Sequence, residues 1–250
     1  MNSYKVLVIN PGSTSTKLAL YENNHCITST NVFHDSSVLM KFPHINDQLL
    51  YRLHVIQEFI ESNQINCSDL DAVMARGGGC VSVESGIYEV NRKMLADTKK
   101  AKGNLYHVSM LGVQLGAECQ KMYGGRLLTM DPPVVDEYQD LARITGISGV
   151  YRTAISHALN LKATIKDHCH RVGKDYEKTN WIVCHIDGGI SITAHRRGRM
   201  IDGNDAGGGQ GPFTPTRMGS MAVTDLLRLL KEKSLEEIQN DCYESGGLSS

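Results

Sequence analysis

The sequence has no long apolar run. Crossing a bilayer takes roughly 20 consecutive apolar residues in a helix, and no segment of this chain approaches that length. The first ten residues, MNSYKVLVIN, have too short an apolar core for a signal peptide and lack a small-residue cleavage site. We therefore expect a cytoplasmic protein without a membrane partner.

An excess of charge of either sign is also missing. The 26 Lys and Arg residues nearly balance the 27 Asp and Glu residues, which leaves a formal net charge of −1. Nucleic acids attract basic surfaces, so the composition gives no reason to expect one as a partner. A hydrophobic content of 41% is typical of a globular protein, and 250 residues can form one large domain or two ordinary ones.

Closely spaced cysteine pairs are absent as well. The seven cysteines are scattered and show no CxxC spacing, which favours reduced thiols over a disulfide framework. A zinc site is the alternative, because His168, Cys169 and His170 precede Cys184 and His185. Three adjacent residues cannot easily direct their side chains at one ion, so the sequence does not favour this alternative.

Strands and helices alternate along the first two thirds of the chain. Apolar runs bounded by turn residues predict strands, and apolar residues at helical spacing predict helices. The expected strands are Lys5–Asn10, Lys17–Tyr21, Ile27–Phe33, Asp71–Ala75 and Arg126–Met130, and the expected helices are Asp47–Ser62, Val108–Met122 and Thr153–Cys169. The segment NRKMLADTKKAK between them is polar and carries no prediction.

The pattern then begins again. Strands are expected at Trp181–His185, Ile190–His195 and Arg199–Asp202, followed by helices at Ser220–Glu232 and Leu235–Cys242. Both halves open with a strand, a turn rich in small polar residues and a second strand. This repetition predicts a duplicated α/β unit that holds one ligand between its two copies.

The first of these turns lies in VINPGSTSTK. One interpretation is a plain β-hairpin turn, since Asn, Pro, Gly and Ser all suit turns. The other is an anion-binding loop, in which Gly12 lets the backbone approach a ligand and Ser13, Thr14 and Ser15 offer donors to phosphate oxygens. The turn alone does not decide between the two.

Polar residues follow several of the expected strands. Arg76 comes before three glycines, Asp131 before two prolines, and His185 and Asp187 flank the second turn. Each has an ordinary structural explanation as a surface ion pair, a turn former or a core histidine. Together they are typical of a site for phosphoryl transfer, which needs cations, a carboxylate for Mg²⁺ and backbone donors.

Six motifs occur in a fixed order along the chain: INPGSTSTK, ARGGG, DPPVVDE, HALN at 157–160, HIDGGIS and GPFTPTRMG. In this order they resemble the acetate and butyrate kinase family of the actin-like ATPase superfamily, which has duplicated ribonuclease-H-like α/β domains. The sequence DGG at 187–189 is closer to the butyrate and branched-chain acid branch, because acetate kinases usually carry a glycine–asparagine pair there.

The resemblance implies reversible, ATP-dependent phosphorylation of a short-chain carboxylate, with Mg²⁺ as cofactor. It assigns catalytic roles to Arg76, Arg217, His157 and His107, phosphate contacts to Asn10, Gly12, Ser13, Ser15, Lys17, His185, Asp187, Gly188, Gly189 and Ser191, and the metal to Asp131 with Asn10. A carboxylate is already a nucleophile at neutral pH. The main task of the protein is therefore to compensate charge as two anions approach, and arginine suits it through its bidentate fork.

The resemblance also sets the expected domains. Residues 1–165 should form the first domain with the first phosphate loop, and residues 166–250 an incomplete second domain with the second loop. Family members continue well past a segment like Gly246–Leu248, and that part would supply the adenosine pocket and much of a homodimer interface. The glycine run in GNDAGGGQGPF departs from the family pattern and leaves the substrate contacts there open.

Three alternatives stay open. A ligand-sensing module of the same superfamily would keep the phosphate loops without the paired arginines. A sugar kinase would use Asp131 or Asp187 as a base for a hydroxyl group. A truncated kinase would keep the first half of the fold without activity. The preference for acyl chain length is not readable from the sequence.

Overall fold

The computed structural model describes residues 3–78, 81–100 and 108–249 and divides the chain into two compact units. The first comprises Met1–Val81 and Gly86–Pro132, and the second Ser82–Ser85 and Pro133–Ser250. The main division falls between residues 132 and 133, whereas the sequence predicted a boundary between 165 and 166. None of the helices in the described ranges has the length and apolar character that a bilayer span requires.

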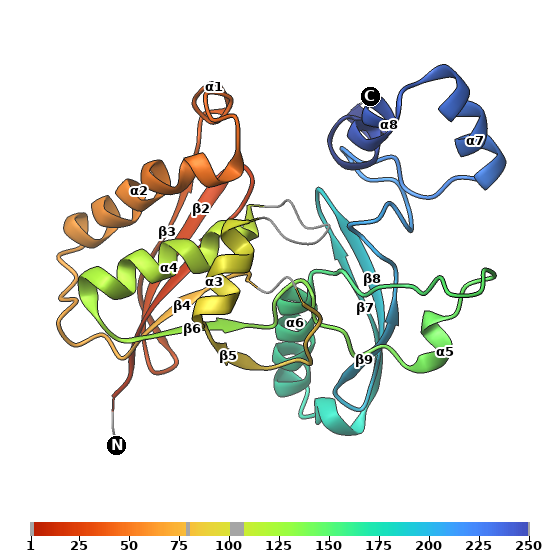
Figure 1. The fold of residues 1–250 in the computed structure, drawn as a ribbon. Coiled ribbons are helices and arrows are strands. Elements are labelled where there is room, and N and C mark those ends of the chain that lie inside the picture. Colours follow the sequence, from red (N-terminus) through yellow and green to blue (C-terminus); the bar gives the residue numbers. More distant parts are fainter. Residues whose placement is uncertain (1–2, 79–80, 101–107, 250) are drawn as a thin grey trace. The chain divides into compact units, whose positions relative to one another are not determined.

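The first unit contains a six-stranded sheet in the order β3-β2-β1-β4-β6-β5 (Figure 1). Its strands are β1 (Lys5–Pro11), β2 (Ser15–Glu22), β3 (His25–Phe33), β4 (Ala72–Ala75), β5 (Ile87–Glu89) and β6 (Arg126–Met130). Strands β1, β2 and β3 form an antiparallel meander, while β4 lies parallel to β1 and β6 parallel to β4. The carboxyl ends of β1, β4 and β6 therefore share one edge of the sheet.

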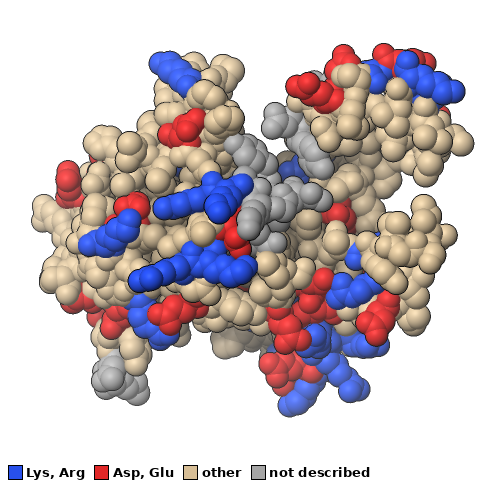
Figure 2. Space-filling view, viewed as in Figure 1, with Lys and Arg blue, Asp and Glu red and all other residues tan. Residues whose placement is uncertain are grey.

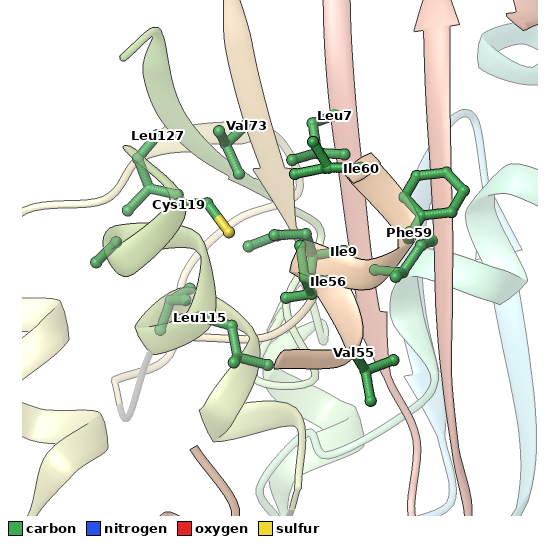
Figure 3. Packing of buried hydrophobic residues seen from close by; sticks show 14 of the residues in the cluster. Leu7, Ile9, Val55, Ile56, Phe59, Ile60, Val73, Leu115, Cys119 and Leu127 are labelled. Atoms are coloured by element: carbon green, nitrogen blue, oxygen red, sulfur yellow. The ribbon is translucent and has the colours of Figure 1, made fainter. Parts of the chain in front are cut away.

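The helices of this unit are α1 (Ser36–Leu39), α2 (Leu49–Ser62), α3 (Arg92–Lys99) and α4 (Ser109–Tyr123), with a 3₁₀ turn at Ile45–Gln48. Figure 3 shows side chains of α2 and α4 packed against alternate residues of β1, among them Leu7 and Ile9, which are fully buried. Helix α3 lies in the polar segment for which the sequence carried no prediction. The side chain of Asn91 caps it by accepting a hydrogen bond from the N–H of Met94.

The second unit has a three-stranded antiparallel sheet in the order β7-β8-β9 among its described residues. Its elements are α5 (Asp140–Arg143), α6 (Ala158–Arg171), β7 (Asn180–Ile186), β8 (Ile190–Arg196), β9 (Arg199–Gly203), α7 (Val223–Glu232) and α8 (Leu235–Asn240), with 3₁₀ turns at Tyr176–Lys178 and Gly247–Ser249 and a π-helical turn at Asp241–Ser245. Helix α6 begins five residues later than the sequence predicted. Residues of its predicted first turn form other hydrogen bonds instead. For example, the N–H of Ser156 donates to the carbonyl of Pro133.

Helix α6 explains where the chain divides. Its residues Leu161 and Ile165 pack with Val183 of β7 and Met200 of β9 in a core separate from that of the first unit. The domain boundary expected after residue 165 placed residues 158–165 of this helix in the first domain. Its apolar face is buried in the second unit instead.

Apolar side chains of the second unit remain uncovered. In β7, Ile182 and Ile186 are 69% and 76% exposed, and helix α7 has no buried residue. The equivalent hairpin of the first unit differs, because β4 pairs with the outer edge of β1 and helices cover Leu7 and Ile9. Among the described residues, no strand pairs with the corresponding edge of β7.

Both signs of charge occur on each unit in the face drawn in Figure 2. In the part of the chain that the structure describes, one ion pair is buried on both sides. Lys162 of α6 donates to the Glu137 carboxylate at 2.6 Å, and the N–H of Met200 donates to the same carboxylate. This pair holds α6 and β9 to the segment that follows β6.

Two buried histidines should make the protein sensitive to acid. His34 and His195 are 6% and 2% exposed, and burial, helped by nearby Arg52 and Lys162 respectively, lowers the pKa of each from 6.5 to about 4. Between these values the unfolded chain binds more protons than the folded one, so the free energy of unfolding falls as the pH falls. The slope approaches about 1.4 kcal/mol per pH unit for each histidine.

Urea titrations between pH 7 and 4 measure this slope. The His34→Gln variant should lose part of it, whereas His54→Gln should keep it, because the imidazole of His54 is exposed on α2. Equal slopes for His34→Gln and the parent chain would contradict the assignment.

Candidate functional site

The first turn, residues 12–15, joins β1 to β2 at the carboxyl end of β1. The N–H of Gly12 donates to the carbonyl of Ser15 at 2.8 Å, and the carbonyl of Thr14 accepts from the N–H of His34 at 2.8 Å. The side chains of Ser13 and Thr14 are exposed, whereas Ser15 is buried. The turn therefore exposes the hydroxyl groups of Ser13 and Thr14 to solvent, while backbone hydrogen bonds within the turn and to His34 hold its main chain in place.

Asn10, Lys17 and Arg76 flank this turn. Asn10 and Lys17 face each other across β1 and β2, and Lys17 is exposed. Arg76 follows β4, where its N–H extends the ladder to the carbonyl of Ile9, and its Nη1 lies 3.4 Å from both Asn10 Oδ1 and the carbonyl of Pro11. The structure thus brings Asn10, Gly12, Ser13 and Arg76 to one end of the sheet.

Close packing of α4 fixes the backbone at Arg76. A Cβ atom on Gly112 of α4 would overlap the carbonyl oxygen of Arg76, and one on Gly77, whose φ is +91°, would overlap the carbonyl oxygen of Ser109. Only glycine permits helix and strand end to approach this closely. Burial lowers the pKa of the Arg76 guanidinium, which nonetheless stays protonated at neutral pH.

Asp131 occupies the same edge of the sheet at the end of β6. It is 1% exposed and has a φ of +40°, an uncommon conformation for a residue other than glycine. Its Oδ1 accepts a hydrogen bond from the N–H of Gly86 at 2.8 Å, and its own N–H donates to the carbonyl of Gly86 at 3.0 Å. These bonds hold a carboxylate at a strained position, as is common at functional sites.

The residues present fit a magnesium ion better than zinc. Among the described residues, no group of three or more His, Cys, Asp or Glu side chains could hold a metal ion. Mg²⁺ commonly takes one or two protein carboxylates and fills its remaining positions with phosphate oxygens and water, and the buried carboxylate of Asp131 suits that mode. Of the residues considered for zinc, Cys169 is buried in the core around α6, and the ring of His168 packs edge-on against Trp181.

The second turn, Asp187–Gly189, joins β7 to β8 in the second unit. A Cβ atom on Gly189 would lie 2.8 Å from Nη1 of Arg217 and 3.0 Å from Cε1 of His157. The absence of a side chain at Gly189 therefore lets the arginine and the histidine reach the turn together. The N–H of Gly188 is held by the Asp187 carboxylate at 2.8 Å.

Hydrogen bonds and ring stacking orient two histidines beside this turn. His157 Nδ1 lies 2.8 Å from the hydroxyl of buried Ser191, and the His157 and His185 rings stack with centroids 3.9 Å apart. His185 Nδ1 lies 3.0 Å from the side-chain oxygen of Asn160, one turn along α6 from His157. His107, the remaining histidine assigned from sequence, lies outside the described residues.

Thr214 and Asp205 position the segment that carries Arg217. The Thr214 hydroxyl donates to the carbonyl of Gly188 at 2.8 Å and accepts from the N–H of Arg217 at 3.1 Å. Asp205 orders the glycine run, because its carboxylate accepts from the N–H groups of Gly207 and Gly208, while Nη1 of Arg217 donates to the carbonyl of Ala206. Burial raises the pKa of the Asp205 carboxyl group.

The sequence did not single out Asn160, Thr214 or Asp205. For two of them a signal was present. Thr214 stands three residues before Arg217, the spacing of a side-chain-to-backbone turn, and Asp205 stands two residues before a pair of glycines. Asn160 had no such signal, because its contact with His185 spans 25 residues of sequence.

No protein-family model matches the chain. Similar curated proteins are "Probable butyrate kinase" of Enterococcus faecalis, 41% identical over 92% of this chain and 63% of that protein, and "Butyrate kinase 1" of Clostridium acetobutylicum, 38% identical over 99% and 70%. "Probable butyrate kinase 2" of Caldanaerobacter subterraneus is 40% identical over 98% of this chain and 69% of that protein. The chain thus spans 63–70% of the length of these relatives.

Similar solved structures share the fold at low sequence identity. The acetate kinase of Porphyromonas gingivalis superposes with a TM-score of 0.67 at 19% identity, over 98% of this chain and 68% of that one. The acetate kinase of Entamoeba histolytica superposes with a TM-score of 0.71 at 16% identity, over 98% of this chain and 66% of that one. A propionate kinase of Francisella tularensis superposes with a TM-score of 0.69 at 18% identity, over 98% of this chain and 69% of that one.

Proposed function

The chain belongs to the acetate and butyrate kinase family, and on this basis we propose that it transfers the γ-phosphoryl group of ATP to a short-chain carboxylate. One observation carries the proposal. Each of the two turns has an arginine beside it, Arg76 at the first and Arg217 at the second. A ligand-sensing module would need the turns to hold a nucleotide, but it would not need these two cations.

The reaction needs charge compensation more than proton transfer. A carboxylate oxygen forms a bond to the γ-phosphorus while the bond from that phosphorus to the bridging oxygen breaks, and the electron pair leaves with ADP. No proton has to move, because the nucleophile is already ionised. Arg76 and Arg217 offset the repulsion between the two anions and the charge that develops on the phosphoryl oxygens.

The remaining residues position these groups. The turn at 12–15 would bind phosphate oxygens through the Ser13 hydroxyl and backbone N–H groups, and the turn at 187–189 would bind them in the second unit. The His157 ring, whose Nδ1 can accept from the Ser191 hydroxyl, would donate a hydrogen bond from Nε2 to the phosphoryl group in flight. The His185 ring, held by the side-chain oxygen of Asn160, would keep the His157 ring in place by stacking against it. Thr214 would keep Arg217 directed at the second turn.

Asp131 and Asn10 would hold Mg²⁺. The ion, when bound, neutralises charge on the phosphate oxygens. The buried position of the Asp131 carboxylate and its fixed Oδ1 are the observations that support this assignment.

Butyrate or a branched-chain acid is the proposed substrate rather than acetate. The sequence DGG at 187–189 and the identity of 38–41% to butyrate kinases support this choice. Because the relatives are longer than this chain, residues 1–250 should be assayed both alone and joined at Ser250 to the remaining segment of a butyrate kinase relative.

The test traps the product. With ATP, Mg²⁺ and butyrate, added hydroxylamine should yield butyryl hydroxamate, since it reacts with acyl phosphates. Hydroxamate from the joined chain but not from residues 1–250 would identify the latter as an inactive portion of a kinase. If neither chain forms a hydroxamate with any acid from two to six carbons while glycerol or a sugar is phosphorylated, a kinase acting on hydroxyl groups replaces this proposal.

A further inference from the structure

Arg52 lies in α2, directly behind the first turn, and none of its surface is exposed. Its Nη1 donates to the carbonyl of Ser15 at 3.1 Å and to the hydroxyl of Thr16 at 3.0 Å, and its Nη2 donates to the carbonyl of Ser13 at 3.2 Å. Its Nε donates to the side chain of Gln48 at 3.0 Å. One guanidinium group therefore holds three acceptors of the turn and its following strand.

Within residues 3–78, 81–100 and 108–249, no carboxylate pairs with this guanidinium. Among the described residues Arg52 forms no ion pair, whereas the similarly buried Lys162 pairs with Glu137 at 2.6 Å. Burial lowers the pKa of Arg52 to about 10, so it remains a cation at neutral pH. A buried charge without a counterion is costly to folding, and an anion bound at the turn would offset part of that cost.

Peptide geometry determines which groups the turn offers to such an anion. The carbonyls of Ser13, Thr14 and Ser15 all accept hydrogen bonds from the protein, the first and last from Arg52 and the middle one from His34. In a trans peptide the N–H points opposite to the carbonyl of the same unit. The N–H group of Thr14 therefore points away from Arg52, and the N–H group of Ser15 points away from the backbone N–H of His34.

His34 does not add a second positive charge. Its Nε2 lies 2.7 Å from the Thr16 hydroxyl, which already accepts from Arg52 and so has its own proton to donate to the imidazole. Its Nδ1 lies 3.1 Å from the hydroxyl of Tyr51. This arrangement fits the neutral imidazole with its proton on Nδ1, and burial beside Arg52 lowers the His34 pKa accordingly.

We propose that Arg52 is a positioning residue for nucleotide binding: it holds the carbonyls of the first turn inward so that the N–H groups face a phosphate, and it supplies an uncompensated positive charge behind them. The inference rests on the proposed function, since that function makes the turn a phosphate site. It adds a residue that touches the turn and not the ligand.

The experiment measures Mg·ATP binding to ¹⁵N-labelled residues 1–250. In the parent chain, Mg·ATP should shift the amide signals of Thr14 and Ser15. Arg52→Met should raise the Kd by roughly 10- to 100-fold, the scale of a lost charge-assisted hydrogen-bond network, and reduce those shifts. Arg52→Lys, which keeps the charge but cannot bridge Ser13 and Ser15, should raise the Kd by a smaller factor.

Ile56→Ala is the matched control. Ile56 lies one turn further along α2 and is fully buried, but it packs in the core and not against the turn. Its replacement should destabilise the fold while leaving the Kd for Mg·ATP within about twofold of the parent value, because it removes apolar packing in the core and leaves the hydrogen bonds of Arg52 to the turn in place. A rise in Kd for Ile56→Ala as large as for Arg52→Met would overturn the inference, since general destabilisation would then explain both.

The outcomes separate the two proposals. If the parent chain binds Mg·ATP and a folded Arg52→Met variant binds it equally well, the role of Arg52 is refuted and the proposed function stands. If Arg52→Met does not fold, Arg52→Lys decides, and an unchanged Kd with unchanged amide shifts refutes the positioning role. If the parent chain binds no Mg·ATP while the joined chain forms hydroxamate, the same variants are measured in the joined chain, and an unchanged Kd for Arg52→Met there refutes the positioning role alone. If neither chain binds Mg·ATP or forms hydroxamate, both proposals fail.

Discussion

Replacing Arg217 with alanine is expected to lower the kcat for acyl phosphate formation by about 10²–10³-fold, and replacing Arg76 should have an effect of similar size. This is the scale on which a preorganised group that stabilises developing charge contributes. Arg217 is held in place through Thr214 and Ala206, and Arg76 through the strand ladder of β4. The hydroxamate assay, in whichever chain is active, measures the loss.

Lysine should rescue each position only in part, because it keeps the charge and loses the planar fork. Arg228→Ala serves as the control, since Arg228 lies on α7 in an exposed pair with Asp225 and should leave kcat unchanged. A higher KM for butyrate with an unaltered kcat in Arg217→Ala would instead assign that residue to ground-state binding of the substrate.

Gly112→Ala is expected to lower the free energy of unfolding of the first unit by about 3 kcal/mol or more, at the upper end of overpacking effects. The new Cβ atom would overlap the backbone carbonyl oxygen of Arg76. Neither α4 nor the end of β4 can yield by a side-chain rotation, so one of them must shift. The strain falls on the segment that positions Arg76, and activity should decline together with stability.

Urea titrations followed by circular dichroism measure this effect, while fluorescence of the only tryptophan, Trp181, reports on the second unit. Gly146→Ala is the control: no atom lies within 4 Å of the added Cβ, and the stability should change by less than about 1 kcal/mol. If Gly112→Ala were as stable as Gly146→Ala, the close approach of α4 to Arg76 would be contradicted.

Most elements were predictable because their signals are local. Strand β1 was predicted as Lys5–Asn10 and spans Lys5–Pro11, and the strands around the second turn differ from prediction by one or two residues. Periodicity of apolar residues and turn chemistry act within a few residues and can be read directly. Helix α3 was missed, because its exposed surface gives it a mostly polar sequence and only the cap at Asn91 marks its start.

The assignment of α6 needed the tertiary structure. In sequence it stands between the two repeats, and its apolar periodicity does not say which of the two cores it joins. Its side chains Leu161 and Ile165 pack with β7 and β9, and Lys162 pairs with Glu137. Which core a helix joins depends on packing between residues far apart in the sequence, and periodicity does not carry that information.

The sequence by itself determined the family, the two turns and the residue types beside them, because six ordered motifs need no coordinates to be read. The tertiary structure decided what supports them. In the sequence, Arg52 is one more charged residue on an amphipathic helix. In the folded chain it is buried, and the groups of the first turn and its following strand to which it donates lie 36 to 39 residues before it in the sequence. The physical reason is that a buried hydrogen-bond network depends on which side chains and backbone groups lie close together in the folded chain. The sequence gives the chemical type of each residue but not these distances.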